Sequence, residues 1–305
     1  PHSAIIESEQ LLSEIFVKVA EGHRLMSVAE ILDEGDSDST LFQQTIYRMT
    51  GKYGAAGIPT GFRDLDKIIK GFRPGQLEVL AARPSVGKSH FGIAVIRNVI
   101  QQHRVDRYGI STSEFRRISL FSLEMSREEI IERMIAIDLG RDFDSLSASE
   151  RAEIEGDLVN SMGRIADWED RLLISDASSL TTDDIVSQVK REARSAQGID
   201  LVVVDHLHLL NDQISRGTTQ ADHIGSMTRR LKDLAREIHC PILLIAQLNR
   251  DSERDQQREP SMVDLRGSGS IEQDADKIIL LHRPSFYIER EVSGWERPSP
   301  GLPTG

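Results

Sequence analysis

The sequence predicts an α/β protein with a central parallel sheet that helices cover on both faces. Three observations lead to this prediction. Short apolar runs recur along the chain, stretches with helical periodicity lie between them, and the runs are apolar at nearly every position rather than at every second one. Strands that are buried on both faces have this continuous apolar character, and parallel strands need helical crossovers between them.

Six apolar runs are expected to form strands, and apolar residues spaced three and four apart predict the helices. The expected strands are 77–82, 118–123, 172–174, 201–204, 242–246 and 278–281. One expected helix begins at His90, and three others cover 128–139, 182–194 and 221–238. Ligands of such a sheet bind at the carboxyl ends of its strands, so functional residues are expected there.

A separate helical arm is expected before the first strand. Its apolar residues have helical spacing: Ile5, Leu12, Ile15, Phe16 and Val19. An amphipathic helix must bury its apolar face, either on the body of the same subunit or on a neighbouring subunit. Because glycines and a proline in 51–61 indicate a hinge, we predict an arm with hinge at 1–56 and a larger domain at 57–305.

The composition is that of a soluble globular protein. The 305 residues include 37 Lys and Arg against 49 Asp and Glu, which gives a formal net charge of −12. Taken alone, this charge argues against a protein coated in nucleic acid or anionic lipid. The single cysteine, Cys240, excludes a disulfide framework within the chain. No apolar stretch reaches the roughly 18 residues that span a bilayer, so we expect a cytoplasmic protein without membrane contact.

A phosphate-binding loop is predicted directly after the first strand. The sequence Ala82-Arg-Pro-Ser-Val-Gly-Lys-Ser89 fits the pattern G-x-x-x-x-G-K-[ST], with Ala in place of the first Gly. Gly87 allows backbone amides to turn toward an oxyanion, Lys88 offers a charge to the β- and γ-phosphates, and the Ser89 hydroxyl can bind Mg²⁺. A chance match is the alternative, but the strand–loop–helix context favours phosphate binding, with ATP and Mg²⁺ as cofactors. The residues expected to bind the nucleotide here are Ala82, Arg83, Pro84, Ser85, Val86, Gly87, Lys88, Ser89 and His90.

Polar residues end three other predicted strands. Glu124, Asp205 and Gln247 directly follow the second, fourth and fifth apolar runs. In a parallel sheet they meet at the edge that carries the phosphate loop. We expect Asp205 on the magnesium side, Glu124 to polarise the water that attacks the γ-phosphate, and Gln247 to contact that phosphate. Each residue alone has an ordinary alternative, because strand ends often carry polar residues and Asp often caps a helix.

Several stretches resemble the motifs of DnaB-type replicative DNA helicases. Besides the phosphate loop, they are Ser122-Leu-Glu-Met-Ser126, Ala246-Gln-Leu-Asn-Arg250 and Asp264-Leu-Arg-Gly-Ser-Gly-Ser-Ile-Glu-Gln-Asp-Ala-Asp276. The similarity runs from about Gly57 to His282. The resemblance implies a RecA-like P-loop core, preceded by a helical linker arm, that forms a hexameric ring around single-stranded DNA and unwinds duplex with 5′–3′ polarity.

The resemblance also implies roles and partners. Lys88, Glu124 and Gln247 would be catalytic, Ser89 and Asp205 would hold the metal, and the helix within 5–19 would dock on a neighbouring subunit. A helicase loader is a further partner that the family implies. The family's N-terminal helical domain lies outside this sequence, so we expect primase contact to be weak or absent.

DNA contact is expected at a basic segment that follows the fifth strand. The residues expected to bind DNA are Arg250, Arg254, Arg258, Arg266, Gly267 and Gly269. The last three fall where the family grips the DNA backbone. A ring can be acidic outside and basic in its channel, so the net charge does not oppose this assignment.

Two positions depart from the family pattern. Gly267 stands where the family usually has Glu, and Pro300 stands where it has an arginine finger. Either the finger is lost or residues of that stretch are missing from the sequence, and both alternatives remain open. Two other functions also remain open: a RecA-like ATP-binding switch or recombinase without unwinding activity, and a fragment that binds nucleotide without turnover.

Overall fold

The computed structural model describes residues 27–33, 35–36, 39–40, 57–105, 111–143, 146–147, 150, 153–213, 217, 219–249, 258–265 and 268–284. The chain divides into two compact units, one of residues 1–54 with 105–110 and one of residues 55–104 with 111–305. The expected helix within 5–19 lies outside the described residues. The predicted domain boundary between residues 56 and 57 also stays a prediction.

Only short elements are described in the smaller unit. Helix α2 (Val28–Asp33) is followed by strands β1 (Gly35–Asp36) and β2 (Ser39–Thr40), which pair antiparallel. The side chain of Ser27 accepts a hydrogen bond from the amide of Glu30, and the Glu30 carboxylate accepts one from the amide of Ser27. This reciprocal pair caps the start of α2.

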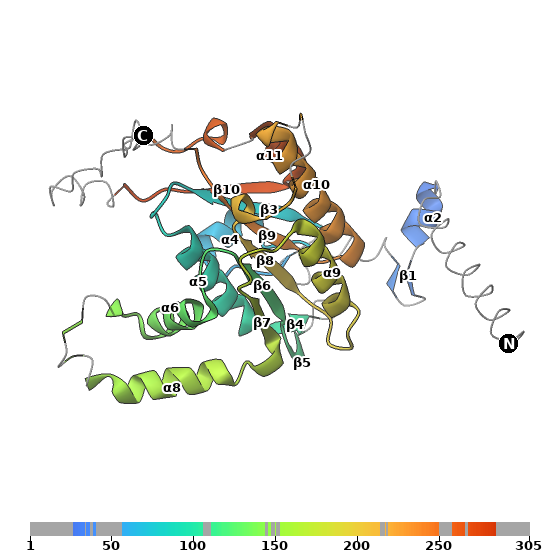
Figure 1. Ribbon diagram of the computed structural model, residues 1–305. Coiled ribbons are helices and arrows are strands. Elements are labelled where there is room, and N and C mark those ends of the chain that lie inside the picture. Colours follow the sequence, from blue (N-terminus) through green and yellow to red (C-terminus); the bar gives the residue numbers. More distant parts are fainter. Residues whose placement is uncertain are drawn as a thin grey trace, which may run out of the picture. The chain divides into compact units, whose positions relative to one another are not determined.

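The larger unit is built on a six-stranded parallel sheet (Figure 1). Its spatial order is β10-β3-β9-β8-β6-β7. The strands are β3 (Leu77–Ala82), β6 (Ile118–Ser122), β7 (Leu172–Ser175), β8 (Leu201–Asp205), β9 (Ile242–Gln247) and β10 (Lys277–Leu281). All six predicted strands and their parallel arrangement are confirmed.

Helices cover both faces of this sheet, as the continuous apolar runs predicted. On one face, α9 (Thr182–Ala193), α10 (Gln220–Ile238) and α11 (Ser268–Asp274) pack on side chains such as Val202 and Val204. On the other, α4 (Arg63–Ile69), α5 (Lys88–Ile100), α6 (Arg127–Leu139) and α8 (Glu155–Ala166) pack with side chains such as Leu201 and Val203. Alternate residues of one strand thus serve opposite cores.

Three predicted helices begin at capping boxes. The side chains of Ser126, Thr181 and Thr219 accept hydrogen bonds from the third residue of α6, α9 and α10, and an acidic side chain at that residue bonds back. Each box satisfies backbone amides that the helix itself leaves without partners. Local sequence therefore fixes where these helices start.

A hairpin of polar residues was not predicted. Strands β4 (His103–Val105) and β5 (Ser111–Phe115) form a separate two-stranded sheet between α5 and β6. Both strands are mostly exposed and carry no apolar pattern. The described part of this unit also contains short 3-10 turns: η2 (Glu169–Arg171), η3 (Leu207–Leu209) and η5 (Met262–Asp264).

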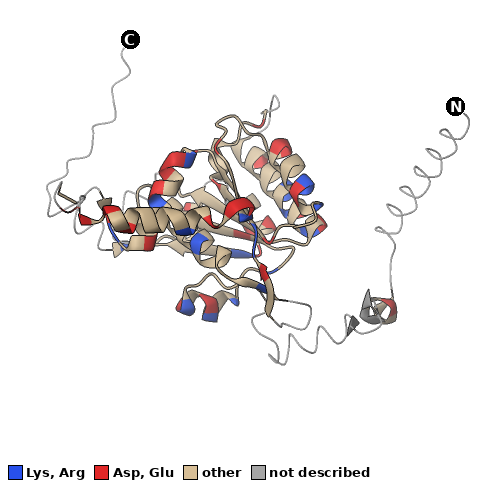
Figure 2. Ribbon diagram, turned by 90° about the horizontal axis from the view of Figure 1, so that it is seen from below, with Lys and Arg blue, Asp and Glu red and all other residues tan. Residues whose placement is uncertain are grey.

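The surface of the larger unit carries charges of both signs. Figure 2 shows acidic and basic residues interspersed over the outer helices, while the central strands are mostly uncharged. Among the described helices, none combines the length and the apolar character that crossing a bilayer would take.

Candidate active site

Four neighbouring strands bring the predicted functional residues to one edge of the sheet. In the order β3-β9-β8-β6, the register pairs Ala82 with Gln247 and Asp205 with Ser122. Two backbone hydrogen bonds continue this pairing beyond the strands, from Leu248 N to Ala82 O at 3.0 Å and from Leu123 N to Asp205 O at 2.6 Å. The loop after β3 and the ends of the other three strands therefore form one connected surface.

The loop between β3 and α5 turns sharply and borders open space. Ser85 has φ 62° and Gly87 has φ 104°, which turns the chain sharply before the first turn of α5. At Gly87, a Cβ atom would meet no described atom within 4 Å, so the loop borders open space. Lys88 and Ser89 follow at the buried start of α5. The open space beside the loop leaves room for an oxyanion.

Lys88 and Glu124 form an ion pair at the centre of this edge. The distance from Lys88 Nζ to Glu124 Oε2 is 2.6 Å. The Lys88 side chain is 9% exposed and the Glu124 side chain is 47% exposed, so solvent reaches the carboxylate. Partial burial alone would raise the pKa of Glu124, but the hydrogen bond and the charge of Lys88 hold it below its usual value. Glu124 is therefore ionised at neutral pH, as a general base must be.

Asp205 and Ser89 have the chemistry and the position to hold Mg²⁺. Asp205 is 4% exposed, and its Oδ1 atom has no hydrogen-bond partner among the described residues. Ser89, Ser122 and Asp205 line the same small cavity, whose other lining residues are apolar. A buried carboxylate oxygen without a partner is costly unless an ion or water meets it. The donor set, one carboxylate and one hydroxyl beside a phosphate loop, fits Mg²⁺.

The residues predicted to contact DNA are only partly described. Arg250, Arg254, Arg266 and Gly267 lie outside the described residues. Gly269 is in α11, where a Cβ atom would meet no described atom within 4 Å.

Arg258 is engaged within the protein. Its guanidinium pairs with Asp264 Oδ1 at 2.5 Å and donates to Ser261 Oγ at 3.2 Å. Its carbonyl accepts a hydrogen bond from Arg83 Nη2 at 2.8 Å, and Arg83 is 2% exposed. The phosphate loop is thus in direct contact with the basic segment that follows β9.

Two residues near the ion pair were missed from the sequence. His206, 5% exposed, directly follows Asp205, and its Nε2 atom lies 3.6 Å from Glu124 Oε2. Burial and the charge of Lys88 lower the pKa of His206, although Asp205 and Glu124 oppose this. In the sequence, the one feature that could have indicated His206 is its position directly after the strand-end carboxylate of Asp205.

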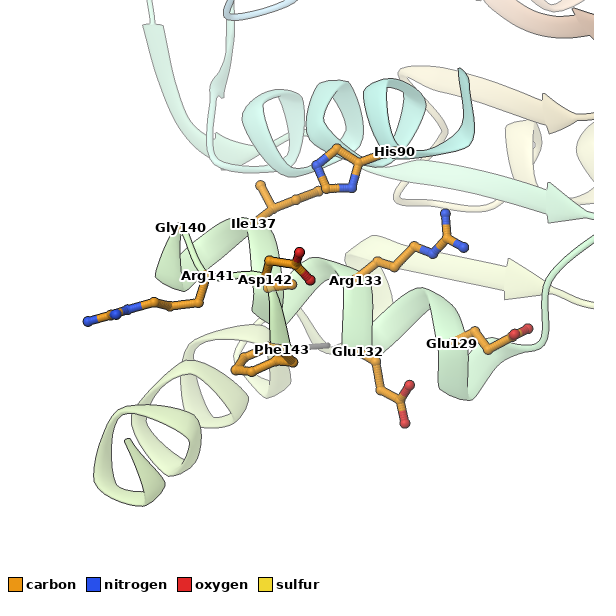
Figure 3. Close-up of a pocket in the computed structure, with 10 residues that line it drawn as sticks. His90, Glu129, Glu132, Arg133, Ile137, Gly140, Arg141, Asp142 and Phe143 are labelled. Carbon is orange, nitrogen blue, oxygen red and sulfur yellow. The ribbon is translucent and has the colours of Figure 1, made fainter. Parts of the chain in front are cut away.

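The other missed residue is Arg133 on α6. With His90, it lines an open cavity of about 770 Å³ between α5 and α6 (Figure 3). Figure 3 shows His90 reaching from α5 and Arg133 from α6 into this space. The charge of Arg133 helps to lower the pKa of Glu124. The pKa of His90 is lowered mainly by burial and further by the charge of Arg133. Nothing in the spacing of α6 distinguishes Arg133 from its other exposed charges.

The chain is similar to known proteins over most of its length. Residues 57–297 match the family described as the DnaB-like helicase C terminal domain. Replicative DNA helicase DnaB of Geobacillus stearothermophilus is 33% identical over 232 residues, which are 76% of this chain and 48% of that protein. The Haemophilus influenzae DnaB is 34% identical over 235 residues, with 77% and 48% covered. The chain thus spans about half the length of these curated relatives.

Two solved structures have the same fold. One is an ATPase domain that is 28% identical, with a TM-score of 0.69 over 84% of this chain and 87% of that one. The other is a DnaB-like replicative helicase, studied with its interactions with primase. It is 26% identical, with a TM-score of 0.69 over 98% of this chain and 68% of that one. The similarity therefore covers the sheet, its helices and the loop after β3.

Proposed function

Because the chain belongs to the family of DnaB-like helicase C-terminal domains, we propose that it is the ATP-hydrolysing motor of a replicative DNA helicase. In this proposal, ATP binds with Mg²⁺ at interfaces between the subunits of a hexameric ring, and its hydrolysis drives the ring along single-stranded DNA. The observation that carries the proposal is the convergence of Lys88, Glu124 and Asp205 at one sheet edge, beside a loop open to a phosphate.

Each residue of this edge has a defined task in the proposed reaction. Lys88 neutralises charge on the β- and γ-phosphates, and Glu124 accepts a proton from the attacking water. Ser89 and Asp205 hold Mg²⁺, which supplies positive charge to the phosphate oxygens. Gln247, half-buried at the end of β9, contacts the γ-phosphate. The task of Glu124 is supported by its lowered pKa and its access to solvent.

We assign DNA binding to the basic segment after β9. The proposed contacts are Arg250, Arg254, Arg258, Arg266, Gly267 and Gly269. The contact from Arg83 to the Arg258 carbonyl supports this assignment, because it joins the phosphate loop to the segment directly. Leu248 also bridges to Leu265, which keeps the two ends of the segment together beside Gln247. A movement at the γ-phosphate can therefore be transmitted to the proposed DNA-binding residues through a small number of direct contacts.

Self-assembly is the remaining part of the proposal. The apolar stripe of the predicted helix within 5–19 supports docking of that helix on a neighbouring subunit, and a helicase loader is a further proposed partner. A ring would place residues of one subunit against the nucleotide of the next.

An unwinding assay on a forked DNA duplex tests the proposed function. The full chain is compared with Lys88→Ala and with Lys67→Ala, an exposed lysine on α4 that lies outside the site. We expect ATP-dependent strand separation by the wild type and Lys67→Ala, and none by Lys88→Ala. ATP hydrolysis without strand separation would favour a RecA-like switch instead. A folded wild type that neither hydrolyses ATP nor separates strands would overturn the proposal.

A further inference from the structure

Among the described residues, Lys88 and His206 each bring a nitrogen within 4 Å of Glu124, and the proposed function assigns only Lys88 to the substrate. Lys88 Nζ lies 2.6 Å from Glu124 Oε2, and His206 Nε2 lies 3.6 Å from the same oxygen. In the proposed function Lys88 binds the phosphates of ATP, so a bound phosphate oxygen would compete with Glu124 for the ammonium group. A general base must nevertheless stay within a fraction of an ångström of its productive position.

Hydrogen bonds hold the backbone around Glu124, whose side chain is 47% exposed. Ser122 Oγ donates to the carbonyl of Met125 at 2.8 Å and accepts from its amide at 3.2 Å, which closes the turn that contains Glu124. The 2.6 Å hydrogen bond from Leu123 N to Asp205 O ties this turn to the residue that precedes His206. These bonds hold the backbone at Glu124 close to the backbone at His206.

The His206 ring is placed to meet the Glu124 carboxylate through Nε2. The ring is buried, and its Nδ1 atom has no hydrogen-bond partner among the described residues. A distance of 3.6 Å exceeds a hydrogen bond, but a carboxylate shift of less than about 1 Å would close it. Catalytic hydrogen bonds are often long until substrate binds.

We propose that His206 is a positioning residue that holds Glu124 toward the attacking water while Lys88 binds the phosphates of ATP. The proposal rests on the proposed ATPase function and deepens it. Before ATP binds, Lys88 restrains Glu124; afterwards, the imidazole Nε2–H donates to Glu124 Oε2. His206 does not touch the nucleotide in this scheme, so its loss should slow turnover without weakening ATP binding.

Variants at His206 separate this role from a structural one. His206→Leu fills a similar volume without a donor, and His206→Gln keeps an N–H near the position of Nε2. We expect kcat for ATP hydrolysis to fall about tenfold to a hundredfold in His206→Leu, with KM and nucleotide affinity within about twofold of wild type. His206→Gln should recover most of the lost turnover. His208→Gln is the matched control, because the ring of His208 on η3 lies 5.9 Å from the His206 ring.

The outcomes distinguish this proposal from the proposed function. A wild type without ATPase activity would sink the function itself. Normal turnover in His206→Leu, beside a wild type that hydrolyses ATP and a Glu124→Gln variant that does not, would overturn only the role of His206. Equal losses in nucleotide affinity and turnover would also overturn it, because they indicate a distorted site. If His206→Leu does not fold, His206→Asn decides: its shorter amide should not reach Glu124, and turnover equal to that of His206→Gln would contradict the proposal.

Discussion

Lys88 Nζ and Glu124 Oε2 lie 2.6 Å apart, although the two residues are 36 positions apart in the sequence and follow different strands. The pair joins the cation expected to bind phosphate to the carboxylate expected to activate water. Each group thereby sets the charge environment of the other, and any ligand that recruits Lys88 also changes the surroundings of Glu124. A phosphate that binds Lys88 would thus change the electrostatic state of the site.

Glu124→Gln should separate nucleotide binding from hydrolysis. The amide cannot accept the proton of water, so we expect turnover to fall by roughly 10²- to 10⁴-fold. ATP affinity should be retained or rise, because Lys88 is no longer held by a carboxylate. Nucleotide titration and phosphate release measure the two effects. Glu128→Gln, an exposed position on α6, is the control, and wild-type turnover in Glu124→Gln would remove it as the base.

Arg266→Ala should weaken DNA binding and leave the ATPase site intact. We expect lower affinity for single-stranded DNA, less DNA-stimulated ATPase activity and unchanged basal turnover. The salt dependence of binding should also fall by about 0.7 in slope for each lost phosphate contact. Binding titrations at several salt concentrations test this, with Arg191→Ala on α9 as the control. A mutant with normal DNA affinity and normal slope would contradict the DNA assignment.

Glu78→Gln should change how stability depends on pH. Burial raises the pKa of Glu78 to about 7, although Lys277 Nζ lies 3.1 Å away and opposes the rise. In the unfolded chain the Glu78 carboxyl loses its proton near pH 4.5. Between pH 4.5 and about pH 7 the native state therefore binds this proton more tightly than the unfolded chain does. Wild-type stability relative to Glu78→Gln should therefore be greatest below about pH 4.5 and fall, by on the order of 2–3 kcal/mol, up to about pH 7.

Urea unfolding of both proteins at several pH values measures this difference. Glu114→Gln, whose side chain is 70% exposed, should show the same pH profile as the wild type. Parallel profiles for wild type and Glu78→Gln would show that Glu78 does not titrate in this range.

Asp138→Asn should loosen the contact between α6 and α8. Asp138 accepts hydrogen bonds from Arg97 at 2.7 Å, from Ser161 at 2.8 Å and from Arg164. Burial would raise the pKa of Asp138, but these bonds hold it at about 2. We expect a loss of about 1–3 kcal/mol in the free energy of unfolding at neutral pH.

The direction in which pH changes the stability follows from the lowered pKa of Asp138. The stabilisation by Asp138 is complete above its ordinary pKa near 3.8 and is lost as the pH falls toward 2. Wild type and Asp138→Asn should thus become similar in stability under acid conditions. Asp233→Asn, exposed on α10, serves as the control in the same unfolding measurements, and a neutral-pH stability equal to wild type in Asp138→Asn would refute the role of this network.

Much of the fold could be predicted from local sequence. The run Leu201-Val-Val-Val204 is apolar at every position because β8 is buried on both faces. The capping boxes of α6, α9 and α10 mark where these helices begin. The hairpin of β4 and β5 was missed because its exposed polar residues carry no such pattern.

By itself, the sequence determined the six strands of the sheet, the helices α5, α6, α9 and α10, and the strand ends that bear Glu124, Asp205 and Gln247, whereas α4, α8 and α11 were not predicted. These features depend on local periodicity and on the rule that parallel strands end at one edge. Only the tertiary structure decided that β6 lies beside β8 and β3 beside β9, because strand order depends on side-chain packing between segments far apart in the chain. That order brings Lys88 and His206 to the same oxygen of Glu124, and it buries Glu78 next to Lys277.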